Sequence, residues 1–203
     1  MEPSARAFRQ RGWFGIAILV PVGLAVLFSR PSIARDSFAD IITDDVAWLI
    51  FLAGGTLRMW STLYVGGRKS REVVCEGPYS LMRNPLYVGS FLLAVSFGVF
   101  LKSFTFAAGV VVVGVMYARH VIPTEEAHLE AGLGEAYRVY LASVPRFLPR
   151  LSGYRTSPAI TVDVPALQLE ARKSLGWVLL PLFGNLLAHL RYLPWWPDLI
   201  RLP

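Results

Sequence analysis

Three long runs without a charged side chain constrain the fold of this chain more than any other feature of its sequence. They cover residues 12–29, 84–101 and 174–190, which is 18, 18 and 17 residues. An α-helix rises about 1.5 Å per residue, so each run can cross most of a hydrocarbon core roughly 30 Å thick. The runs therefore predict transmembrane helices rather than the interior of a water-soluble domain.

The composition agrees with a membrane location. Of 203 residues, 54% are hydrophobic and only 17% are charged, which is more apolar surface than a soluble domain of this size can hide. The net charge of +6 is spread along the chain beside the apolar runs, and this pattern fits headgroup anchoring better than nucleic-acid binding. A single cysteine, Cys75, excludes an internal disulfide and argues against a cysteine-based metal cluster, so we expect no metal site.

Two further apolar segments complete a predicted bundle of about five transmembrane helices. Residues 46–67 are interrupted by Arg58, which either marks a functional site or extends to the headgroups. Residues 104–122 follow the run at 84–101 after a join so short that the two helices must pack antiparallel. Basic residues precede the first run, as in a signal peptide, but we expect this run to remain in the protein as a transmembrane helix. The last run either spans or dips into the membrane and returns, and we favour spanning.

An amphipathic helix is predicted at residues 125–144, where apolar side chains recur at helical spacing between charged ones. We expect it to lie at the cytoplasmic interface of the membrane. Residues 151–168 have the composition of a surface linker. The predicted fold is therefore an all-α integral membrane protein, with one domain over residues 1–203.

Lysine and arginine are distributed unequally between the two predicted sides of the membrane. Fourteen lie on the side of the N-terminus and five on the other, with Arg58 inside the membrane. Because cytoplasmic segments carry the excess of positive charge, the N-terminus is predicted to be cytoplasmic. We expect the membrane to be a bacterial inner membrane.

The segment at residues 76–89 joins two apolar runs, yet its sequence, EGPYSLMRNPLYVG, is too specialised for a passive connector. Pro78 and Pro85 lack a backbone N–H and push the preceding residue out of helical geometry, which predicts a fixed, irregular turn. Beside a membrane, such backbone is tolerated mainly where it is buried in protein or lines a site. We predict that this turn forms one half of a site and that Glu125 and Glu126 form the other.

Five short motifs follow one another along the chain: GPY at 77–79, RNPLYVG at 83–89, EE at 125–126, GEAYRVY at 134–140 and VPRF at 144–147. Together they resemble the isoprenylcysteine carboxyl methyltransferase and phospholipid methyltransferase superfamily. The likeness covers about residues 56–150, and its order and spacing make it much more specific than any single motif. The linker and additional membrane helix at 151–203 lie outside this core.

The resemblance implies an enzyme, an S-adenosylmethionine-dependent methyltransferase that releases S-adenosylhomocysteine on the cytoplasmic side. Two positions depart from the family pattern: Asn84 stands where histidine is usual, and Val121, not Arg119, aligns with a substrate-binding arginine. Arg119 and Glu126 are the candidates for catalysis. Positions carried over one by one predict that the cofactor is bound by Val73, Val74, Tyr79, Asn84, Pro85, Leu86, Tyr87, Gly89 and Glu125.

The residue types suit that cofactor. The Glu125 carboxylate can accept hydrogen bonds from ribose hydroxyls or an ammonium group, and the rings of Tyr79 and Tyr87 can attract a sulfonium cation. Simpler interpretations are also open. Glu125 and Glu126 can be favourable charges in a first helical turn, and the tyrosines can be interfacial anchors.

We expect the methyl acceptor to be an amphiphilic, lipid-like molecule that reaches the site from the bilayer. Carboxyl O-methylation of a lipidic or isoprenylcysteine-like acid is the first hypothesis. Phospholipid headgroup N-methylation is the second, and S-methylation of a small thiol is the third. The alternative from another class is a noncatalytic membrane scaffold or lipid-binding module.

Overall fold

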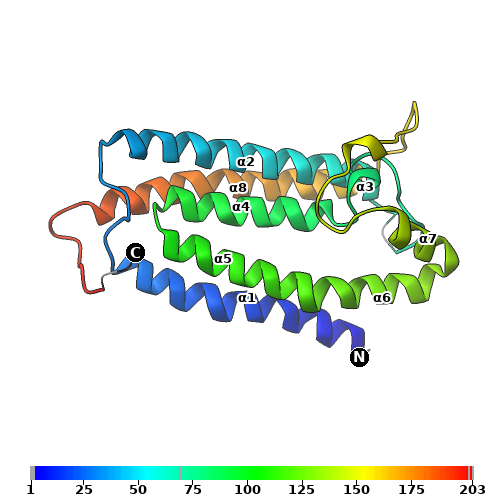
Figure 1. Ribbon diagram of the computed structural model, residues 1–203, viewed down its shortest axis with the longest axis horizontal. Coiled ribbons are helices and arrows are strands. Elements are labelled where there is room, and N and C mark those ends of the chain that lie inside the picture. Colours follow the sequence, from blue (N-terminus) through cyan, green and yellow to red (C-terminus); the bar gives the residue numbers. More distant parts are fainter. Residues whose placement is uncertain (1–2, 69, 201, 203) are drawn as a thin grey trace. The chain divides into compact units, whose positions relative to one another are not determined.

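The computed structural model describes residues 3–68, 70–200 and 202, and this part of the chain contains helices and no strand (Figure 1). The predicted all-helical class is confirmed. Some of the basic residues behind the predicted orientation lie outside the described part. These are Lys69 and Arg201, together with the side chains of Arg6, Arg9 and Arg11.

The described helices differ widely in length. The long ones are α1 (Pro3–Leu27), α2 (Phe38–Val65), α4 (Pro85–Phe100), α5 (Phe104–Met116) and α8 (Val164–Arg191). The short ones are α3 (Pro78–Leu81), α6 (Ile122–Leu133) and α7 (Glu135–Ser143), together with a π-helical turn, η1 (Tyr117–Val121), and a 3-10 turn, η2 (Leu151–Gly153).

By length and composition, one helix in the described part of the chain can cross a membrane. It is the continuous run Phe104–Leu133, formed by α5, η1 and α6, whereas Gly15–Leu27 and Pro85–Phe100 are shorter apolar helices. Five transmembrane helices are therefore not confirmed. The described apolar helices at two of the predicted spans, Gly15–Leu27 and Pro85–Phe100, are too short to meet that criterion.

Two predicted boundaries were wrong. The linker at 151–168 ends early because α8 begins at Val164, where the Asp163 carboxylate accepts a hydrogen bond from the Ala166 N–H at 2.7 Å and caps the helix. The helix predicted at 125–144 is divided into α6 and α7. The break falls at Gly134, whose φ of 64° lies in the left-handed region that favours glycine.

The chain forms two compact units, and the divisions between them fall within α2, α4 and α8 and at the start of α6. The first unit comprises Met1–Ile50, Ala94–Ile122 and Leu179–Pro203, and the second comprises Phe51–Leu93 and Pro123–Val178. The prediction of one domain over the whole chain stays a prediction.

In the first unit, α1 runs beside α5 (Figure 1). The Arg191 side chain at the end of α8 is buried and donates hydrogen bonds to the carbonyl oxygens of Ser29 at 2.8 Å and Leu101 at 2.7 Å. These carbonyls follow the ends of α1 and α4, where backbone acceptors lack intrahelical partners. Arg191 therefore satisfies them in an apolar setting.

In the second unit, the predicted irregular turn is confirmed. Pro78 opens α3, Met82 returns to an extended conformation, and Pro85 opens α4. Gly77 has φ 57°, and a Cβ atom there would lie 2.4 Å from the ring of Tyr64. Only glycine fits this position without displacing its neighbours.

Candidate functional site

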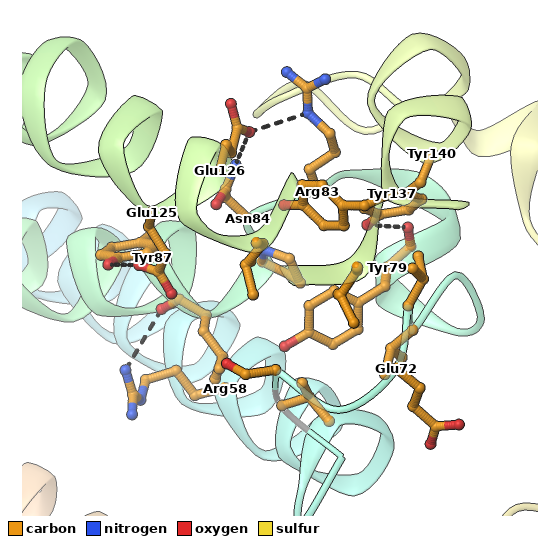
Figure 2. A pocket seen from close by; sticks show the side chains of 18 of the residues that line it. Arg58, Glu72, Tyr79, Arg83, Asn84, Tyr87, Glu125, Glu126, Tyr137 and Tyr140 are labelled. Carbon is orange, nitrogen blue, oxygen red and sulfur yellow. Dashed lines mark hydrogen bonds and ion pairs between the residues drawn. The ribbon is translucent and has the colours of Figure 1, made fainter. Parts of the chain in front are cut away.

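A cavity of about 230 Å³ in the second unit is lined by both halves of the predicted site (Figure 2). One wall comes from the turn before α4 and from its first residues, and the other comes from α6 and α7. Of the residues predicted to contact cofactor or to act in catalysis, those lining the cavity are Val73, Val74, Tyr79, Asn84, Pro85, Leu86, Tyr87, Glu125 and Glu126.

The two halves meet directly. The Tyr87 hydroxyl on α4 donates a hydrogen bond to the Glu125 carboxylate on α6. Pro85 makes this contact possible because it starts α4 at the turn and places Tyr87 in the first helical turn, on the cavity wall. The structure thus brings together two predicted segments, whose roles in binding stay predictions.

Glu126 is buried and holds several segments together. Its carboxylate lies 2.6 Å from Arg146 and 3.2 Å from Arg83, and it accepts a hydrogen bond from the Asn84 side chain at 3.2 Å. Arg83 also donates to the Leu141 carbonyl oxygen at 2.5 Å. These contacts join the turn at residues 83–85 (the RNP turn), α6, α7 and the VPRF segment at residues 144–147.

Three tyrosine side chains give the cavity an aromatic wall (Figure 2). Burial raises the pKa of Tyr79 well above its usual range, and the neighbouring Tyr140 and Glu125 add to the effect. Burial and the nearby Glu126 raise the pKa of Tyr137 to about 12. Burial also raises the pKa of Tyr140, whose hydroxyl donates to the Tyr79 carbonyl oxygen at 2.9 Å. All three side chains are therefore neutral near pH 7.

The Tyr79 hydroxyl is a buried polar group of this wall that a ligand could hydrogen-bond. Tyr79 is only 8% exposed, and among the residues that the structure describes its hydroxyl has no hydrogen-bond partner. Burying a hydroxyl without a hydrogen bond costs on the order of 1–3 kcal/mol. A polar ligand group in the cavity would remove that cost.

Comparison with known proteins assigns the chain to a family. Residues 46–136 match the sequence model of a family described as phospholipid methyltransferase. Over 198 residues the chain is 31% identical to the nickel-cobalt-cadmium resistance protein NccN of Alcaligenes xylosoxydans xylosoxydans, an alignment that covers 97% of this chain and 92% of NccN. The chain belongs to the phospholipid methyltransferase family.

A second relative of this family member is the cobalt-zinc-cadmium resistance protein CzcN of Cupriavidus metallidurans. The two are 36% identical over 122 residues, which is 60% of this chain and 56% of CzcN. No solved structure matches the chain. Phospholipid methyltransferases are integral to membranes and generally use S-adenosylmethionine. The superfamily resemblance read from the five motifs is confirmed.

Two residues of the predicted site do not line the cavity. Arg119 lies in η1, within the first unit. Gly89 packs between α4 and α2, where a Cβ atom would lie 2.6 Å from Cγ of Arg58 and 2.9 Å from the carbonyl oxygen of Gly54. Its structural role is to allow the two helices to approach closely.

Several residues that line the cavity were not assigned to the site from sequence. Arg58 carried a signal, since an arginine within an apolar run is a functional candidate. Tyr137 and Tyr140 stood within a family motif but received no role. Ser90, Leu129 and Leu133 also line the cavity but carried no signal, because serine is ordinary in an apolar helix and leucine is ordinary on the apolar face of an amphipathic helix.

Proposed function

We propose that this chain is an S-adenosylmethionine-dependent membrane methyltransferase that acts on an amphiphilic acceptor. The observation that carries the proposal is the hydrogen bond between Tyr87 and Glu125 at the wall of one cavity. Family membership supports methyl transfer as the reaction. The contact supports a single site for it, because it joins the two predicted halves at one cavity.

The residues at the cavity fit the chemical groups of that cofactor. The Glu125 carboxylate can accept hydrogen bonds from ribose hydroxyls or from the ammonium group. The buried Tyr79 hydroxyl can donate to or accept from a polar atom of the ligand, and tyrosine rings attract a sulfonium cation. When bound, S-adenosylmethionine supplies an electrophilic methyl group. The cavity is somewhat smaller than the roughly 300–1,000 Å³ typical of ligand pockets, so we expect its walls to move outward on binding.

The contacts of Glu125 and Glu126 suit these carboxylates to holding and orienting groups at the cavity. Glu126 is engaged by two guanidinium groups, and Glu125 accepts from Tyr87. Within the described part of the chain, the lining includes no lysine, histidine or cysteine. An acceptor that is already ionised needs no base. This favours carboxyl O-methylation of a lipidic or isoprenylcysteine-like acid over methylation of an amine headgroup or a thiol.

Of the two residues proposed for catalysis, Glu126 would act through the turn that it holds. Arg119 is proposed as a contact for the acceptor.

We also propose that residues 1–203 act as one methyltransferase domain in a bacterial inner membrane, with the N-terminus and the cavity facing the cytoplasm. The acceptor would enter from the bilayer and the cofactor from the cytoplasm.

The names of NccN and CzcN suggest a setting for this chemistry. NccN is named for resistance to nickel, cobalt and cadmium, and CzcN for resistance to cobalt, zinc and cadmium. We propose that this chain methylates a membrane component in cells exposed to such metal ions. Growth of a deletion strain with and without the metals, complemented by wild-type and Glu125→Ala genes, tests whether methylation has that role.

The activity itself is tested with methyl-labelled S-adenosylmethionine, the purified protein and a total lipid extract of the host membrane. We expect label to enter the lipid fraction and to be released as methanol by mild alkali, because methyl esters hydrolyse under those conditions. Label that resists alkali would instead indicate N- or S-methylation. Failure to label the extract, together with failure to bind S-adenosylhomocysteine, would support the scaffold alternative.

A further inference from the structure

Arg58 of α2 forms a largely buried ion pair with a residue of α8 beside the cavity. Its side chain is 17% exposed and that of Glu170 is 6% exposed. The Glu170 carboxylate accepts from Arg58 Nε at 2.8 Å and lies 2.5 Å from Nη2. The guanidinium carbon also stands 5.0 Å from the centre of the Trp177 ring, within the range of a cation–π contact.

The other side of the same guanidinium group holds the first turn of α4. Arg58 Nη1 donates to the Ser90 hydroxyl and to the Leu86 carbonyl oxygen, the latter at 3.4 Å. The Ser90 hydroxyl in turn donates to the Leu86 carbonyl oxygen at 2.8 Å. Pro85, Leu86 and Tyr87 of this turn line the cavity, as does Arg58 itself (Figure 2).

Gly89 leaves the space that the Arg58 side chain occupies. A Cβ atom at Gly89 would lie 2.6 Å from Arg58 Cγ, closer than real side chains approach. The glycine of the RNPLYVG motif therefore allows the arginine to pass along α4 and reach Ser90. This packing accounts for the glycine without a direct contact to a ligand.

We propose that Arg58 and Glu170 are positioning residues that fix the first turn of α4 for cofactor binding. The proposal rests on the proposed function. A buried ion pair is weak evidence for stability, because taking both charges out of water is costly. Here the pair has a specific consequence, since it determines where the Leu86 carbonyl and the following turn lie. Glu170 lies outside the family match at 46–136, so α8 adds to the site of this chain.

The test uses full-length protein in detergent and the variants Glu170→Gln and Arg58→Lys. Glutamine keeps the shape of Glu170 and removes its charge, and lysine cannot reproduce the forked contacts of arginine. Glu135→Gln is the matched control, because Glu135 is in an exposed ion pair with Arg138. Calorimetry gives the dissociation constant for S-adenosylhomocysteine, and hydrogen exchange reports on the backbone of residues 84–92 and 135–143.

We expect both pair variants to bind S-adenosylhomocysteine about tenfold more weakly, as for the loss of one charged hydrogen bond, and the control to match the wild type. We also expect faster exchange in residues 84–92 and unchanged exchange in 135–143. Unchanged affinity in Glu170→Gln would overturn the inference, and so would exchange that rises equally in both segments. If the wild type itself does not bind S-adenosylhomocysteine, the proposed function is wrong, and so is the role of the pair in cofactor binding. Intact exchange protection at 84–92 in Glu170→Gln would refute the positioning role alone.

Discussion

The Tyr87 hydroxyl donates a hydrogen bond to the Glu125 carboxylate, although the two residues are 38 positions apart in the sequence. This contact joins the first turn of α4 to α6 at the wall of the cavity. A carboxylate oriented in this way has its remaining acceptor sites directed by the protein before a ligand arrives. Such preorganisation lowers the cost of binding.

Replacing Tyr87 with phenylalanine removes this donor and keeps the aromatic ring. We expect the affinity for S-adenosylhomocysteine to fall by about 1–2 kcal/mol, because the carboxylate loses an orienting hydrogen bond. Calorimetry measures the change. Tyr192→Phe, whose hydroxyl bonds to the Ile33 carbonyl oxygen in the first unit, is the control and should bind as the wild type does. Equal affinity in Tyr87→Phe and the wild type would show that the contact does not prepare the site.

Glu126→Gln tests the buried cluster that holds the RNP turn. The change leaves Arg83 and Arg146 without the charge that neutralises them. Because removal of one partner from a buried ion pair is strongly destabilising, we expect the free energy of unfolding to fall by about 3 kcal/mol. Denaturant unfolding in detergent measures it. Glu135→Gln, in an exposed pair, should change stability by less than about 1 kcal/mol, and a similar loss in both variants would contradict this account of Glu126.

Gly77→Ala tests the backbone of the GPY turn. The positive φ and the Tyr64 ring 2.4 Å from a new Cβ atom both oppose the change, so we expect a loss of about 2–3 kcal/mol in stability. Gly132→Ala is the matched control, because a Cβ atom at Gly132 meets nothing within 4 Å in α6. That variant should be as stable as the wild type or more stable by about 0.5–1 kcal/mol. Thermal unfolding of the two variants compares them directly, and a stable Gly77→Ala would refute the role of the turn.

The raised tyrosine pKa values predict how stability depends on pH. The pKa of Tyr137 is about 12 in the folded protein, and the usual value is about 10. Below pH 10 both the folded and the unfolded chain keep this proton. As the pH rises from about 10 to 12 only the unfolded chain loses it, so the free energy of unfolding should fall over that range. Unfolding measured from pH 8 to 12 tests this, and Tyr137→Phe should reduce the alkaline loss; an identical profile in the variant would contradict the assignment.

Local chemistry explains which parts of the fold could be predicted from the sequence. Pro78, Pro85 and the glycine before α3 restrict the backbone themselves, so the irregular turn follows from neighbouring residues alone. The break at Gly134 depends on a positive φ that the amphipathic pattern across it conceals. The start of α8 was predicted too late, although the sequence carries a signal for it: Asp163 is a capping residue and Pro165 follows in the first turn.

In the candidate site, too, some contacts could be predicted from the sequence and others could not. Tyr87 and Glu125 could be placed together because both lie in motifs whose order resembles one family. The pairing of Arg58 with Glu170 spans 112 positions and ends in a helix outside those motifs. A charge that finds its partner only in the folded chain leaves no local pattern. Arg58 was therefore visible as an unusual residue, and its partner was not.

Binding of S-adenosylhomocysteine to the purified protein, measured by calorimetry, tests the central claim most directly. We predict that the wild type binds, that Glu125→Ala weakens binding by about 1.5–3 kcal/mol, and that Arg119→Ala leaves the affinity unchanged because Arg119 does not line the cavity. Absence of binding to the wild type, or an unaltered affinity in Glu125→Ala, would contradict the claim that this cavity holds the methyl donor.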